Sequence, residues 1–162
     1  MYKQFVPKVI SFTLLCCIAF LTPQLAHAYV RVFLTSGATW TVPSDWSGVN
    51  TIEVIGGGGA GANAVATEGA GGGGAGAYAA ITDLAGLSAG SSINIQVGTG
   101  AAAPPDNTIG GTGGDTYFNR GASATTTCSA QEPQSVCAKG GVGGAKGTAA
   151  APVGGAGGSS DA

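Results

Sequence analysis

The chain contains 162 residues, of which 31 are glycine, six are basic, eight are acidic and one is histidine. So few ionisable side chains exclude most classes of enzyme, because acid–base and nucleophilic catalysis need paired or activated groups. The formal net charge of −2 and the lack of clustered lysine and arginine exclude a nucleic-acid-binding surface. The composition therefore indicates an architecture more clearly than a chemical activity.

The N-terminal residues 1–28 have the features of a signal peptide. A basic start precedes an almost wholly apolar stretch at 9–21, and an A-x-A cleavage site follows at Ala26 and Ala28. Cleavage there makes Tyr29 the first residue of the mature chain. The alternative, a transmembrane anchor, needs roughly 20 apolar residues, and this stretch has 13. We therefore expect a secreted, periplasmic or cell-surface protein with no membrane span after signal removal.

Six short stretches predict β-strands, because their apolar residues recur with a period of two. The clearest is 92–97, where Ile93, Ile95 and Val97 are expected to face a core. No window has the 3.6-residue repeat of an amphipathic helix, so few helices are expected. The six stretches are 30–34, 39–42, 51–55, 77–81, 92–97 and 116–118.

Glycine is concentrated in five clusters, which hold 22 of the 31 glycines. Ordering a glycine costs roughly 0.5–1 kcal/mol more than ordering an alanine, so the clusters must either recover this cost by close packing of backbones or stay disordered. Extended three-fold polyglycine helices, packed side by side, are the first alternative. Flexible linkers are the second, above all for the two C-terminal clusters. The clusters are 56–61, 71–76, 110–114, 140–144 and 154–158.

The order of the strand and glycine motifs resembles a known family. It is similar to the glycine-rich domain of phage tail-fibre and bacterial surface proteins, and to the glycine-rich region of the anaplastic lymphoma kinase receptor family. The resemblance covers about residues 33–118 and implies an all-β, jelly-roll-like β-sandwich with inserted polyglycine helices, used for recognition outside the cell. The motifs that carry it are W-T-V-P at 40–43, I-E-V-I-G-G-G-G at 52–59, G-G-A-G-A-Y-A at 73–79, I-x-I-x-V-G-x-G at 93–100 and G-G-D-T-Y-F at 113–118.

The mature chain is expected to divide into a β-sandwich with glycine-rich insertions at 29–120 and a glycine-rich C-terminal segment at 121–162. The glycine clusters at 71–76 and 110–114 are shorter than the long runs of the family, so any helix bundle should be modest. No closing strand is expected after the last cluster. This leaves two alternatives to a complete domain, namely a fragment and a domain whose partner strands lie in another chain.

Cys128 and Cys137 are the two cysteines that remain once the signal peptide is removed. A compartment that permits disulfides favours one local bridge between them. Closing a loop of this length stabilises a fold by roughly 2–3 kcal/mol. The alternative is two free thiols.

Few residues are candidates for a chemical or binding role. Asp115 lies in a single copy of the calcium-binding nonapeptide G-G-x-G-x-D-x-U-x, which cannot complete a site alone, so we expect no metal and favour a turn-capping role. Asp83 and Asp106 lie in separate loops, and the mature chain has no histidine, so neither an enzyme nor a cofactor is expected. Trp46, in a polar loop, is the candidate ligand-binding residue, because aromatic residues dominate binding hot spots.

The sequence therefore predicts a secreted or cell-surface, non-enzymatic domain for recognition or adhesion, whose partner is a surface glycan or protein. The alternative is a structural or self-assembling component of an extracellular assembly, whose glycine segments pack against identical chains. Neither alternative involves nucleic acid.

Overall fold

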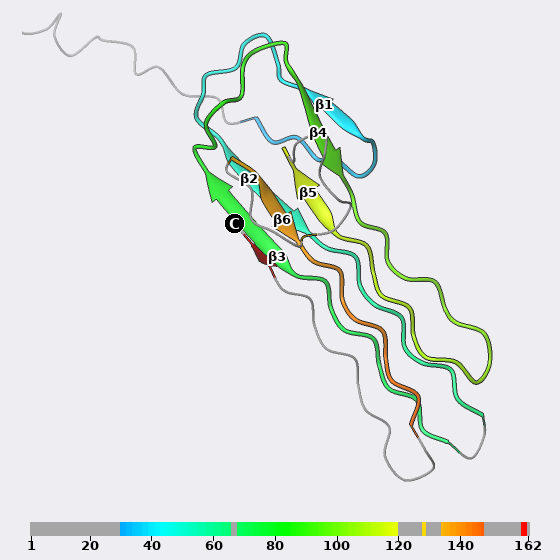
Figure 1. The fold of residues 1–162 in the computed structure, drawn as a ribbon. Helices are drawn as coiled ribbons and strands as arrows, with labels where there is room; N and C mark the ends of the chain where they lie inside the picture. Colours follow the sequence, from blue (N-terminus) through cyan, green and yellow to red (C-terminus); the bar gives the residue numbers. More distant parts are fainter. Residues whose placement is uncertain (1–29, 66–67, 120–127, 129–133, 148–159, 162) are drawn as a thin grey trace, which may run out of the picture. The chain divides into compact units, whose positions relative to one another are not determined.

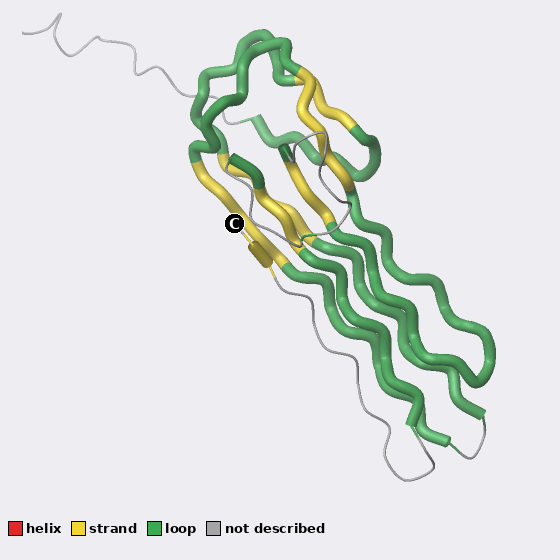
Figure 2. Tube along the Cα trace, in the orientation of Figure 1, coloured by secondary structure: helices red, strands yellow, loops and turns green. Residues whose placement is uncertain are grey.

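The computed structural model describes residues 30–65, 68–119, 128, 134–147 and 160–161. The chain divides into two units, Met1–Phe33 and Leu34–Ala162, and the strands of the described residues belong to the second unit. These residues form seven β-strands and no helix (Figures 1 and 2). The all-β class is therefore confirmed for the described part of the chain.

The strands form two antiparallel sheets, one of five strands and one of two. The five-stranded sheet has the order β1 (Thr39–Thr41), β4 (Ser92–Gln96), β5 (Thr116–Phe118), β6 (Val136–Ala138) and β7 (Ser160–Asp161). The two-stranded sheet pairs β2 (Thr51–Ile55) with β3 (Tyr78–Thr82).

The two sheets pack face to face, with β2 against β5 and β6 and with β3 against β6 and β7. Alternation along the strands places one set of side chains between the sheets, as the burial of Val54, Ile93, Ile95 and Phe118 shows. The Trp40 ring extends this core, because its centroid lies 5.6 Å from that of Phe118. The expected core positions Ile93 and Ile95 are confirmed, whereas Val97 is only half-buried and follows the end of β4.

Five of the six predicted strands are present, with ends that differ by at most one residue. The stretch 30–34 forms no strand, so that prediction is wrong. Two strands were not predicted. β6 is buried at all three residues and so lacks an alternating pattern, and β7 provides the closing strand that the sequence analysis did not expect.

Candidate functional site

Glycine-rich segments connect the strands and run side by side beyond the ends of the sheets (Figures 1 and 2). We call five of them the glycine segments: 56–63 after β2, 69–77 before β3, 98–101 after β4, 108–115 before β5 and 139–147 after β6. The cluster at 154–158 lies outside the described residues.

Backbone hydrogen bonds between the glycine segments recur at every third residue. In segment 56–63, every third amide, starting at Gly56, donates to a carbonyl of segment 69–77. The amides that follow these, starting at Gly57, donate to carbonyls of segment 108–115. The donor–acceptor distances are 2.8 to 3.0 Å. Both pairs of segments are antiparallel, because the acceptor number falls by three as the donor number rises by three. The donor and acceptor pairs are Gly56–Ala77, Gly59–Gly74 and Ala62–Gly71 in the first set, and Gly57–Gly114, Ala60–Gly111 and Asn63–Thr108 in the second.

Segment 139–147 is hydrogen-bonded to three of the other glycine segments. It accepts hydrogen bonds from 69–77 and 108–115, and its Gly141 and Gly144 amides donate to the Gly57 and Ala60 carbonyls over 2.8 Å. Three neighbouring segments therefore surround it. The Gly147 amide donates to the Gly69 carbonyl, so the donors of this segment also recur at every third residue.

Close packing explains why this segment reads G-G-x-G-G. A Cβ on Gly140, Gly141, Gly143 or Gly144 would overlap a backbone carbonyl of a neighbouring segment. Val142, which occupies the third position, has a side chain that is 45% exposed. Glycine is thus required where the segment faces its neighbours, and a side chain is accepted where it faces solvent.

Polar side chains join the loops at the far ends of the glycine segments. Asn63 Nδ2 donates to Asp106 Oδ1 over 2.8 Å. Lys146 Nζ lies 3.2 Å from Glu68 Oε2 and also donates to Asn107 Oδ1. We call these five residues the loop-end cluster. It links Asn63 and Glu68 to the loop 102–107 and to the end of segment 139–147. It contains Asp106, which the sequence analysis placed in a loop separate from the other carboxylates.

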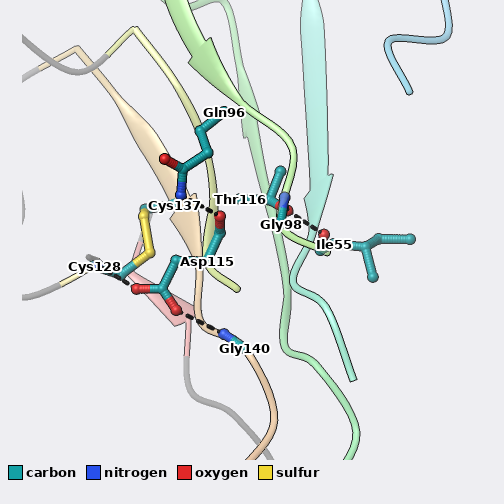
Figure 3. The surroundings of a disulfide bond; sticks show 8 residues. All are labelled: Ile55, Gln96, Gly98, Asp115, Thr116, Cys128, Cys137 and Gly140. Carbon is teal, nitrogen blue, oxygen red and sulfur yellow. Dashed lines mark hydrogen bonds between the residues drawn. A yellow bond between two sulfur atoms is a disulfide. The ribbon is translucent and has the colours of Figure 1, made fainter. Parts of the chain in front are cut away.

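The Asp115 carboxylate connects the disulfide to the glycine segments (Figure 3). Its Oδ1 accepts from the Gly140 amide over 2.8 Å and its Oδ2 accepts from the Cys128 amide over 2.5 Å. The predicted Cys128–Cys137 disulfide is present, with its Cα atoms 5.8 Å apart. Asp115 therefore holds together two backbone segments distant in sequence.

Among the described residues, no group of three or more His, Cys, Asp or Glu side chains could hold a metal ion.

Next to Asp115, the Thr116 hydroxyl joins the two sheets. Thr116 Oγ1 donates to the Ile55 carbonyl over 2.6 Å and accepts from the Gly98 amide over 2.9 Å. The side chain is buried, so both bonds are shielded from water. β5 is fixed in this way to the ends of β2 and β4, where the glycine segments begin.

Trp46 is half-buried and packs against the core. Its ring lies edge-on to that of Trp40, with 5.9 Å between the centroids. This packing explains the presence of an aromatic ring at position 46 without invoking a ligand, and the role of Trp46 in binding stays a prediction.

The predicted cleavage site, at Ala26, Ala28 and Tyr29, lies outside the described residues.

The exposed face of the two-stranded sheet carries one ionisable pair. Tyr78 is 54% exposed and lies diagonally across from Glu53, whose direct partner on β3 is Ala80. Desolvation, together with a hydrogen bond to Glu53 and the negative charge of that carboxylate, raises the pKa of Tyr78 above its ordinary value.

The sequence analysis missed the loop-end cluster as a group. Its members are isolated polar residues, and each hydrogen-bonded pair is separated by at least 39 positions in the sequence. The available signal is that Glu68 and Lys146, two of the few charged residues of the chain, each flank a glycine cluster.

In the described residues, two antiparallel sheets and packed glycine segments define an all-β, glycine-rich architecture. A family model described as a glycine-rich domain matches residues 34–162, and the chain therefore belongs to this glycine-rich domain family. No curated protein and no solved structure matches the chain. Within the described residues, no helix is long and apolar enough to cross a membrane.

Proposed function

We propose that this chain is a secreted or cell-surface domain for recognition or adhesion, and that it acts without catalysis. The observation that carries the proposal is the set of hydrogen bonds at every third residue, which ties the glycine segments together and holds the connecting loops at their far ends. Binding residues lie disproportionately on loops positioned by a rigid scaffold. The glycine segments supply such a scaffold, and the loops beyond them supply the surface.

We further infer the finer architecture, a jelly-roll-like sandwich extended by three-fold polyglycine helices. The period of three in the hydrogen bonds supports the helices, because a polyproline-II-like helix has three residues per turn and no internal hydrogen bonds. Each turn then directs its amides and carbonyls to neighbouring segments. In segment 139–147, the crowded positions are glycine and the outward position carries the Val142 side chain.

The binding surface is proposed to be the loop 101–109 with the loop-end cluster. Asn63, Lys146 and their partners fix this loop from two sides. Ile109 is 68% exposed beside these polar groups. An apolar side chain with fixed polar neighbours suits a surface glycan or a protein, because it gives contact area while the polar groups set orientation.

A binding screen with a matched pair of variants tests this function. The unmodified chain is screened against a glycan array and against intact cells, and Ile109→Ser is compared with Val49→Ser, which changes a side chain that is 78% exposed elsewhere. We expect Ile109→Ser to weaken binding by at least about tenfold, since truncating a hot-spot residue costs about 2 kcal/mol or more, and Val49→Ser to leave it unchanged. Failure of the unmodified chain to bind any glycan or cell, or equal losses in both variants, would contradict the proposal.

A further inference from the structure

The outer edge of β3 is unpaired in the described part of the chain. β3 has one neighbour, β2, within its sheet. The Asp83 amide donates to the Asn50 carbonyl, and the Gly56 amide donates to the Ala77 carbonyl. Because hydrogen-bonded pairs alternate along antiparallel strands, the odd-numbered residues of β3 bond to β2. The amides and carbonyls of Tyr78, Ala80 and Thr82 are therefore directed away from β2, toward the open edge.

β3 also lacks the features that protect edge strands from further pairing. Proteins usually protect such edges with charges, proline or short length. β1 has three residues with Pro43 close behind, β7 has two residues, and β2 carries Glu53. β3 has five residues and contains no charge, proline or glycine. It is therefore the edge in the described residues most suited to accept another strand.

The stretch 30–34 has a strand pattern but forms no strand. Its sequence is V-R-V-F-L, with β-branched or aromatic residues at three of five positions. Val30 and Phe33 are 77% and 78% exposed. Such a stretch is stabilised by pairing with an open sheet edge. There its backbone forms hydrogen bonds and its apolar side chains become buried.

A chain cannot place its own stretch 30–34 on its own β3 edge. β1 lies at one end of the five-stranded sheet, whereas β3 packs against β6 and β7 at the other end. Strands lie about 4.8 Å apart and packed sheets about 10 Å apart, so a strand added outside β3 lies more than about 20 Å from β1. The chain from Leu34 to Thr39 spans at most about 18 Å when fully extended. A second copy must therefore supply the strand.

We propose that residues 30–34 of one copy pair, antiparallel, with the outer edge of β3 of a second copy. In the register that the side chains favour, Arg31 lies opposite Ala80 and Phe33 lies opposite Tyr78. Val30 then lies beside Ile81 and Val32 beside Ala79, which continues the inner face of the two-stranded sheet. The proposal concerns self-association and does not depend on the recognition function.

Charge and aromatic complementarity select this register. Glu53 is the direct cross-strand partner of Ala80, so Arg31, on the other side of Ala80, reaches toward the Glu53 carboxylate over a single methyl group. Phe33 and Tyr78 form an aromatic cross-strand pair, a type of contact that stabilises sheets. If the pairing shifted by one residue, every side chain of the added strand would move to the other face of the sheet. Arg31 would then point between the two sheets, where a lone charge is disfavoured.

Charge reversal with restoration tests the proposal. The molar mass of the purified chain is followed by size-exclusion chromatography with light scattering over a range of concentrations. We expect concentration-dependent association that weakens by about tenfold in Arg31→Glu and in Glu53→Arg, since a lost attraction and a new repulsion together amount to roughly one decade in affinity. The double variant Arg31→Glu with Glu53→Arg should recover the original association.

Asp45→Arg serves as the matched control, because it reverses an exposed carboxylate outside the two-stranded sheet and should leave association unchanged. Hydrogen exchange gives an independent measurement on the unmodified chain, in which the Tyr78, Ala80 and Thr82 amides should become protected as concentration rises. A monomer at every concentration, equal losses in Asp45→Arg and Glu53→Arg, or a double variant that stays as weak as the single variants would overturn the proposal.

Discussion

At Gly141 the missing side chain is a structural requirement, whereas at Gly72 it is not. A Cβ on Gly141 would overlap the carbonyl of Gly74, and backbone cannot move aside as a flexible side chain can. A Cβ on Gly72 meets nothing within 4 Å, and its φ lies outside the left-handed region that favours glycine. The excess of glycine therefore combines positions of two different kinds.

We predict that Gly141→Ala destabilises the fold by about 2–4 kcal/mol through steric overlap. Gly72→Ala should leave stability unchanged or raise it by about 0.4–1 kcal/mol, because alanine restricts the unfolded chain. Urea denaturation of both variants measures the difference. Similar losses at the two positions would show that the two glycines are equivalent, contrary to this structure.

Tyr78 gives the fold a pH dependence at the alkaline end. Its pKa is raised, so the folded state holds its proton more tightly than the unfolded state, whose tyrosine titrates at about 10. Its contribution to stability is therefore present below that value and is lost as the pH rises through the folded pKa. We expect Glu53→Gln to lower the pKa of Tyr78, which an ultraviolet titration of tyrosinate measures against Tyr78→Phe. An unchanged titration in Glu53→Gln would exclude Glu53 as a cause.

At the scale of elements, Asp115 and the disulfide form one unit around Cys128. We predict that Asp115→Ala destabilises the fold by about 3–6 kcal/mol, because hydrogen bonds to a charged group contribute about 1.5–3 kcal/mol each and two amides lose theirs. Removing the disulfide through Cys128→Ser with Cys137→Ser should cost about 2–3 kcal/mol. Since both changes release Cys128, the triple variant should lose less than the total of the separate losses, which thermal unfolding can establish. Strict additivity would argue against a shared unit.

The strands could be predicted from the sequence where one face of the strand is buried and the other is exposed to solvent. In β4, for example, the buried side chains of Ile93 and Ile95 alternate with more exposed ones. β6 could not be predicted, because Val136, Cys137 and Ala138 are all buried and give no period. The sequence also predicted that glycine backbones pack closely, but not which segments meet, since glycines differ only in their neighbours. Trp46 was expected to be a binding residue from its polar flanks, and its contact with Trp40 depends on the folded loop.

At the scale of the whole molecule, the glycine segments should exchange their amide hydrogens in a pattern with a period of three. In segment 139–147, the Gly141, Gly144 and Gly147 amides donate to the carbonyls of other segments. We predict that these three exchange slowly and that Val142 and Ala145 exchange fast, as native-state exchange followed by NMR can measure. Uniformly fast exchange would show flexible linkers in place of packed segments.

The period of three in the backbone contacts also constrains how the chain can change in length. Inserting one or two residues into a glycine segment would bring glycines out of the crowded positions and outward residues such as Val142 into them. Inserting three residues into every glycine segment would preserve the register between the segments and move the loops outward by roughly 9 Å at 3.1 Å per residue. The reach of the loops is therefore adjustable in whole turns, without any change to the sandwich that supports them.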